Sequence, residues 1–118
     1  MDATTTFFED LNRRGHDPLL EKVDGTIRFD LARDGGEDHV YVTVRKGDIA
    51  VSDGSAGADF VVRAGRDVFN GIASGERNAM ASVLRGALAF EGDPQMFLRF
   101  QRLFPGPPQA GSQKGGRS

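Results

Sequence analysis

The chain has 118 residues, enough for one domain with one hydrophobic core. Its 15 Lys and Arg residues stand against 17 Asp and Glu residues, and no segment concentrates basic side chains, so nucleic acid is not an expected partner. The absence of cysteine excludes disulfides, thiolate catalysis and cysteine-ligated zinc. The start of the chain lacks the pattern of a signal peptide, and no run of about eighteen apolar residues occurs, so we expect a soluble cytoplasmic protein.

The first 23 residues predict a helical lead-in, over residues 4–23. Thr6 and Glu9 have the spacing of a capping box, which predicts a helix that begins near Phe7 and ends at Gly15. An Asp-Pro pair at positions 17 and 18 indicates a second short helical piece. The first helix is expected to carry Phe7, Phe8 and Leu11 inward, and the second piece runs through Leu19, Leu20 and Val23.

From Thr26 the apolar residues alternate with period two, which is typical of strands with one solvated face. Strands are predicted over residues 26–32, 40–45, 48–52 and 59–64. Short turn sequences separate the first three strands, so their pairing is expected to be antiparallel. Val, Ile, Phe and Leu occupy the inner face, and Arg, Thr, Tyr and acidic residues such as Asp30 occupy the outer face.

Helical spacing returns at Arg66–Ser74, and Gly75 is placed to end that helix. Asn78 is suited to cap a further helix that stops at Gly86, and residues 88–90 then alternate as a fifth strand. The side chains expected to line the inner sides of the two helices are Val68, Phe69, Ile72, Met80, Val83 and Leu84.

The segment Gly92-Asp93-Pro94 joins the fifth strand, expected to end at Glu91, to a last helix beginning at Pro94. Gly permits a tight exit from the strand, Asp caps the helix, and Pro suits its first position. One apolar stripe follows, made of Met96, Phe97, Phe100, Leu103 and Phe104. The folded domain is expected to span residues 1–104, and the Pro-, Gly- and Ser-rich residues 105–118 are expected to form a disordered tail.

Reactive groups do not converge in the sequence. His16 and His39 lack metal-binding spacing, no serine lies in a nucleophile elbow, and the glycine-rich turns match no phosphate-binding motif. Asp93 lies two residues from Glu91, but its position is explained by helix capping. We therefore predict no catalytic residues, no metal site and no cofactor.

Three segments carry a resemblance to a known family: GTIRFD from Gly25, DFVVRAGRDVFNGIASGE from Asp59, and GALAFEGD from Gly86. In order and spacing, over about residues 24–104, they resemble the sterol carrier protein 2 (SCP2) domain of lipid-binding and lipid-transfer proteins. The resemblance implies an α+β fold in which helices cover one apolar face of a five-stranded, largely antiparallel sheet. It also implies a hydrophobic cavity that holds fatty acyl chains, sterols or similar lipids without covalent chemistry.

Large aromatic and pliable Met side chains on the late helices suit a cavity wall that adapts to a guest, although stripes of this kind are usually plain core. The predicted ligand-binding residues are Phe60, Val62, Phe69, Ile72, Met80, Leu84, Leu88, Phe90, Met96, Phe97, Phe100 and Phe104. Leu98 lies outside the main stripe, as an isolated exposed leucine, a membrane contact at a cavity mouth, or a dimer contact.

Three functions remain open at this point. The leading hypothesis is a non-enzymatic carrier of a hydrophobic small molecule or lipid, with transient membrane contact. The second is a protein-interaction module with a vestigial cavity, which forms a homodimer through the last helix or docks on an enzyme. The third, an enzyme acting on an apolar substrate, has the least support because no reactive side chains cluster.

Overall fold

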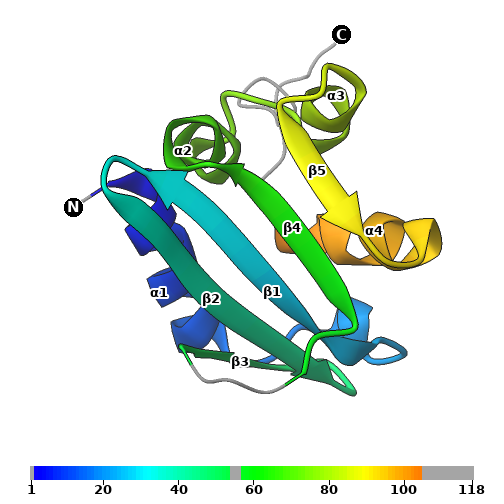
Figure 1. The fold of residues 1–118 in the computed structure, drawn as a ribbon. Helices are drawn as coiled ribbons and strands as arrows, with labels where there is room; N and C mark the ends of the chain where they lie inside the picture. Colours follow the sequence, from blue (N-terminus) through cyan, green and yellow to red (C-terminus); the bar gives the residue numbers. More distant parts are fainter. Residues whose placement is uncertain (1, 54–56, 105–118) are drawn as a thin grey trace, which may run out of the picture.

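The computed structural model describes residues 2–53 and 57–104, and the predicted tail at 105–118 lies outside them. The strands are β1 (Asp24–Arg33), β2 (Gly36–Arg45), β3 (Asp48–Ser52), β4 (Phe60–Gly65) and β5 (Leu88–Glu91). The α-helices are α1 (Ala3–Arg14), α2 (Arg66–Ser74), α3 (Ala79–Leu84) and α4 (Pro94–Phe100), with 3₁₀ turns η1 (Pro18–Leu20) and η2 (Gln101–Leu103). The predicted α+β class is confirmed, as Figure 1 shows.

One mixed sheet contains the five described strands, in the order β3-β2-β1-β4-β5. The pairs β1–β2, β2–β3 and β4–β5 are antiparallel. For β1–β2 and β2–β3 this confirms the prediction from the short turns that join them. The pair β1–β4 is parallel, with Phe29 opposite Val62. No local sequence signal marks this pair, because its connection is a crossover and not a tight turn.

The helices cover one face of the sheet and leave the other face open, which is the face turned to the viewer in Figure 1. Residues of β1 alternate accordingly: Ile27, Phe29 and Leu31 are buried beneath the helix layer. The described core joins the sheet to α1, α2, α4 and η2 through Phe, Leu, Ile and Val side chains. Burial of this apolar surface is the main driving force for the fold.

Helix caps follow the predicted chemistry at three of the four helical starts that were assigned a cap. Asp17, Asn78 and Asp93 accept hydrogen bonds from the backbone N–H groups of Leu19, Ala81 and Gln95, each at 2.9 Å. The predicted start near Phe7 is wrong, because α1 begins at Ala3 with Asp2 as its cap. The Oδ1 atom of Asp2 accepts from the N–H of Thr5 at 3.0 Å, so the cap lies one turn earlier than the apparent capping box.

Leu84, which was expected to line the inner side of its helix, is exposed instead, and Leu19 in the lead-in is exposed as well. Leu19 is 64% exposed and Leu84 is 80% exposed. The single 3₁₀ turn η1 buries Leu20 and directs its neighbour Leu19 outward. The short helix α3 buries Ala79 and Ser82, so Leu84, at its last position, lies on the solvent side.

Candidate functional site

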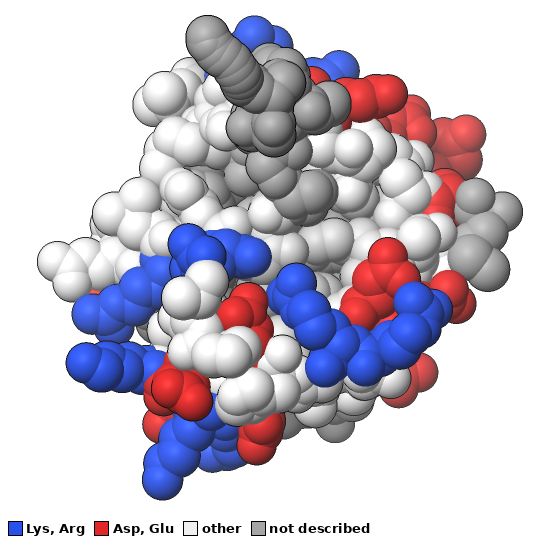
Figure 2. Space-filling view, turned by 180° about the vertical axis from the view of Figure 1, so that it is seen from behind, with Lys and Arg blue, Asp and Glu red and all other residues white. Residues whose placement is uncertain are grey.

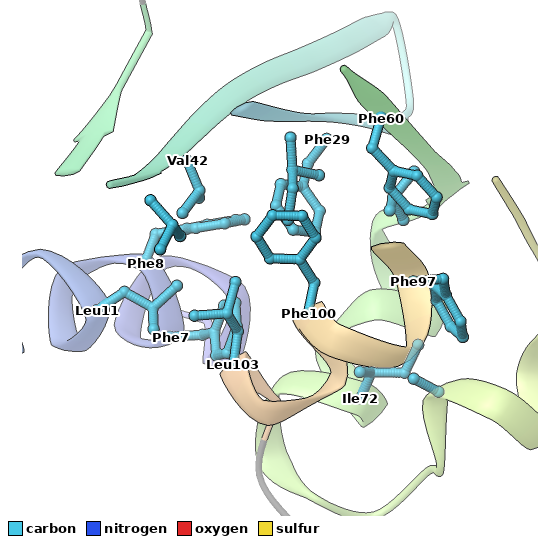
Figure 3. Packing of buried hydrophobic residues seen from close by; sticks show 14 of the residues in the cluster. Phe7, Phe8, Leu11, Phe29, Val42, Phe60, Ile72, Phe97, Phe100 and Leu103 are labelled. Carbon is cyan, nitrogen blue, oxygen red and sulfur yellow. The ribbon is translucent and has the colours of Figure 1, made fainter. Parts of the chain in front are cut away.

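An aromatic interior lies between the sheet and the helices. The Phe69 ring lies 5.5 to 6.0 Å, centroid to centroid, from the rings of Phe7, Phe8, Phe29 and Phe104. A second group contains Phe60, Phe90 and Phe97, whose ring centroids lie 4.9 to 6.0 Å apart. Figure 3 shows that Phe100 reaches into the space between the two groups, toward the sheet. The side chains that were predicted to line a cavity therefore contact one another in this structure.

The structure brings the predicted lining residues together, with one exception. Those in the buried core are Phe60, Val62, Phe69, Ile72, Leu88, Phe97 and Phe100. Those partly buried against the core are Met80, Phe90, Met96 and Phe104. Leu84 is the exception, because it points to solvent on α3. A ligand contact for each of these residues stays a prediction.

A first groove of about 540 Å³ runs along α1, the end of α2 and η2. Its apolar lining comes from Phe7, Leu11, Leu103 and Phe104. The basic side chains of Arg14 and Arg102 belong to its rim, together with the acidic Asp2 and Asp10. Sequence reasoning assigned Phe7 and Leu11 to the core but did not predict that they meet Phe104, since residues so far apart in the chain carry no shared pattern.

A second groove of about 520 Å³ runs along η1, α4 and η2 and shares Arg102 and Phe104 with the first. Leu19, Val23 and Leu98 supply its apolar side chains. Phe104 is thus the predicted site residue that lines both grooves. Figure 2 shows the helix side of the molecule, where basic and acidic side chains are interspersed with uncharged surface and not gathered into one large basic patch.

Arg66 ties together the starts of α1 and α2 and the β1–β2 hairpin. Its Nε donates to Asp2 at 2.7 Å, its Nη1 to Asp38 at 2.7 Å, and its Nη2 to the Thr5 hydroxyl at 2.9 Å. The hydrogen bond from Arg66 holds the pKa of Asp2 far below its usual range. Hydrogen bonds from Arg33 and then Arg66 also lower the pKa of Asp38. This junction borders the first groove through Asp2, and we assign it a structural role.

Substituting Arg66→Ala is expected to lower the free energy of unfolding by about 1.5–3 kcal/mol, because charged hydrogen bonds to two carboxylates are lost. Arg66→Lys keeps the charge but not the planar fork, so a smaller loss is expected. Because the pKa values of Asp2 and Asp38 are lowered by folding, their stabilisation is present above the unfolded-state pKa and is lost as the pH falls. The difference between wild type and Arg66→Ala should therefore shrink below about pH 5 in urea titrations. A difference that stays constant with pH would contradict an ionic role for this junction.

The open face of the sheet holds a buried carboxylate that the sequence placed in solvent. Asp30 is only 3% exposed, because Arg28, His39 and Arg63 surround it. Burial favours a raised pKa for Asp30, but hydrogen bonds from His39 at 2.6 Å and from Arg28 at 3.0 Å outweigh it and hold the pKa below its usual value. The burial of Asp30 could not be predicted from the sequence, because the residues beside it on neighbouring strands depend on the strand register.

Asp30, Glu37 and His39 place potential ligand atoms within 4.8 Å of one another, the spacing that a metal ion would require. However, both Asp30 oxygens already accept hydrogen bonds from the Arg28 guanidinium, and Arg63 lies 3.5 Å away. Two cationic side chains at the same carboxylate oppose a metal cation. The arrangement is that of an ion-pair network on the sheet surface.

The class of protein follows from these features: an α+β domain whose helix layer and sheet enclose an aromatic interior, with two grooves beside it that mix apolar and charged side chains. In the part of the chain that the structure describes, no helix is long and apolar enough to cross a membrane. The model of the SCP-2 sterol transfer family matches residues 8–105. The chain belongs to this family, whose members are generally non-enzymatic lipid carriers. The resemblance drawn from the sequence is confirmed.

Solved structures support the fold. The palmitated SCP2L2 of Aedes aegypti matches with a TM-score of 0.71 and 18% identity, covering 87% of this chain and 94% of that one. The apo sterol carrier protein 2 of Yarrowia lipolytica matches with a TM-score of 0.66 and 20% identity, covering 81% and 84%. No curated protein matches the chain in a sequence comparison.

A third match is to a much longer protein, the sec-alkylsulfatase Pisa1 from Pseudomonas sp. The TM-score is 0.67 and the identity 22%, and the match covers 83% of this chain but 16% of the sulfatase. The fold therefore also occurs as a small part of a longer enzyme chain. At this identity, the match is evidence for the fold alone.

Proposed function

We propose that this domain binds lipid-like molecules, such as fatty acyl chains or sterol-like compounds, between its sheet and its helices, without covalent chemistry. The observation that carries the proposal is the position of Phe104. Its ring stacks on Phe7 with centroids 5.7 Å apart and lies 6.0 Å from Phe69, so it belongs to the aromatic interior. The same residue lines both surface grooves beside η2. An apolar guest would reach the interior by displacing this ring.

The size and chemistry of the first groove fit such a guest. Its volume of about 540 Å³ is within the usual range for small-molecule sites, which is roughly 300–1,000 Å³. Burial of about ten methylene groups contributes on the order of 8 kcal/mol before the costs of association, which allows micromolar affinity. Arg14 and Arg102 at the rim are placed to meet the polar end of an amphiphile.

The chain has no tryptophan, so one introduced indole reports on one place. In Phe104→Trp, titration with a fatty acid is expected to give a saturable change in emission, because the ring must move when the guest enters. Leu84→Trp is the matched control, since Leu84 is exposed and lines neither groove. Phe104→Asp should weaken uptake by about tenfold or more, because a carboxylate replaces an apolar contact.

Native mass spectrometry and lipid extraction of the purified wild-type protein test the proposal directly. A co-purified lipid, or saturable uptake of a fluorescent fatty acid, is the expected result. A reproducibly empty protein with no saturable uptake would refute the carrier function.

The second candidate function is a docking module. It is favoured by the occurrence of the same fold in a longer sulfatase chain, of which the match covers 16%. In that case α4 and a sheet edge would contact a protein partner or a second copy, and the interior would serve only as core. Sedimentation distinguishes the two functions: an obligate dimer without ligand uptake supports docking, and a monomer with uptake supports the carrier.

A further inference from the structure

A further groove, of about 350 Å³, lies between α1 and the β2–β3 side of the sheet. Among the described residues, it shares no lining side chain with either groove beside η2. Its apolar floor consists of Phe8 of α1, Val40 of β2 and Val51 of β3. The Phe8 ring centroid lies 5.2 Å from that of Phe29, so this floor backs onto the aromatic interior. We call this pocket the α1–β3 groove.

The charges that line the α1–β3 groove are unevenly compensated. Its charged lining residues are Glu9, Asp53 and Arg66. The Arg66 guanidinium already donates hydrogen bonds to two carboxylates, those of Asp2 and Asp38. Glu9 and Asp53 are exposed, and in the described part of the chain neither carboxylate forms an ion pair or accepts a hydrogen bond. Both carboxylates are therefore available to a cationic ligand.

We propose that the α1–β3 groove binds small organic cations in which an ammonium group is attached to an apolar chain. The chain would cover the floor formed by Phe8, Val40 and Val51, and the ammonium group would donate charged hydrogen bonds to Glu9 and Asp53. The volume of about 350 Å³ is within the usual range for small-molecule sites, which is roughly 300–1,000 Å³.

This site differs from the proposed lipid site in both place and ligand. The lipid-like guest would enter at Phe104, which does not line the α1–β3 groove. A fatty acid carboxylate in this groove would meet like charges, because the carboxylates at and beside Arg66 outnumber its single guanidinium. The inference therefore does not depend on the proposed carrier function.

Octylammonium, octanol and octanoate share one alkyl chain and differ in the charge of the head group, so they test the site directly. In calorimetric titrations at pH 7 and low salt, octylammonium should bind saturably and at least about tenfold more tightly than octanoate. Added salt should reduce this preference, because it screens exposed charges. Amide NMR signals of Asn12, Val40 and Val51 in the groove lining should shift with octylammonium.

A pair of charge-matched double variants tests the role of the two carboxylates. Glu9→Gln with Asp53→Asn should lower the affinity for octylammonium about tenfold or more and change that for octanol by less than about twofold. Asp34→Asn with Glu76→Gln is the control, because it removes the same charge from exposed positions outside the groove lining. The control should change octylammonium binding by less than about twofold.

The inference is overturned if octylammonium does not bind, if octanoate binds as tightly, or if both double variants lose affinity equally. It is also overturned if the NMR shifts lie at Phe104 and η2 and not at the groove. Uptake of a fluorescent fatty acid by Glu9→Gln with Asp53→Asn should equal that of wild type. Absence of this uptake in every protein, with octylammonium binding intact, would refute the carrier function and leave the cation site standing.

Discussion

Replacing Phe69 with alanine is expected to lower the free energy of unfolding by about 3–5 kcal/mol, the range for a fully buried phenylalanine. Phe69 has no exposed surface, and it contacts rings from α1, β1 and the end of η2. Truncation would leave a void at the meeting point of these rings, because the surrounding elements relax only partly. Equilibrium unfolding in urea, followed by far-UV circular dichroism, measures the change.

Leu84→Ala is the control for this measurement, since its exposed side chain should change stability by no more than about 0.5 kcal/mol. A loss below about 1 kcal/mol for Phe69→Ala would contradict tight packing around this ring. It would mean that the interior is already hollow in solution, which would favour the proposed lipid binding there. Repeating the titration with bound fatty acid then shows whether a guest restores the lost stability.

Gly92→Ala is expected to cost about 2–5 kcal/mol, because it adds steric overlap to backbone strain. The φ angle of Gly92 is +130°, a conformation that residues with a side chain rarely adopt. A Cβ atom there would lie 2.6 Å from Cδ1 of Phe60 and 3.1 Å from the carbonyl oxygen of Asp59. Thermal or urea unfolding of the variant measures the combined effect.

Gly86→Ala separates the two contributions. Gly86 has a φ angle of +79°, but no atom lies within 4 Å of its added Cβ, so only the conformational cost of about 1–2 kcal/mol applies. Equal losses in the two variants would show that Phe60 moves aside freely. That outcome would contradict the close packing of β4 against the β5–α4 joint.

The packed interior sets a requirement on lipid binding. Phe97 and Phe100 of α4 and Leu103 of η2 are all buried, so they fill the interior that the proposed guest would enter. A guest of the kind proposed must therefore displace side chains. Phe104 is a candidate, because it follows the single 3₁₀ turn η2 and is partly exposed, unlike Phe97 and Phe100. We expect the rearrangement to centre on Phe104 and η2 and to leave the sheet unchanged.

The sequence by itself determined the local helices and strands and most of the residues at which they begin and end. Several element ends follow from the chemistry of residues only a few positions apart. These are the helix at Arg66–Ser74, the helix start at Pro94, the strand end at Glu91, and the caps at Asn78 and Asp93. The sequence also predicted the apolar stripe of the last helix. Phe97, Phe100 and Leu103 of this stripe are buried, even though the α-helix is followed by a 3₁₀ turn. Together with the family segments, these signals were enough to predict the fold class.

Only the tertiary structure decided which distant residues meet. Three features depend on strand pairing or on segments far apart in the chain. They are the parallel pairing of β1 with β4, the burial of Asp30 beside His39 and Arg63 on neighbouring strands, and the groove that Leu19 and Leu98 both line. Periodicity within one segment states which face is apolar, but it carries no information about register or about which other segment covers that face. Phe104 shows the difference most clearly: its place in an apolar stripe was readable from the sequence, whereas its position between the aromatic interior and two surface grooves was not.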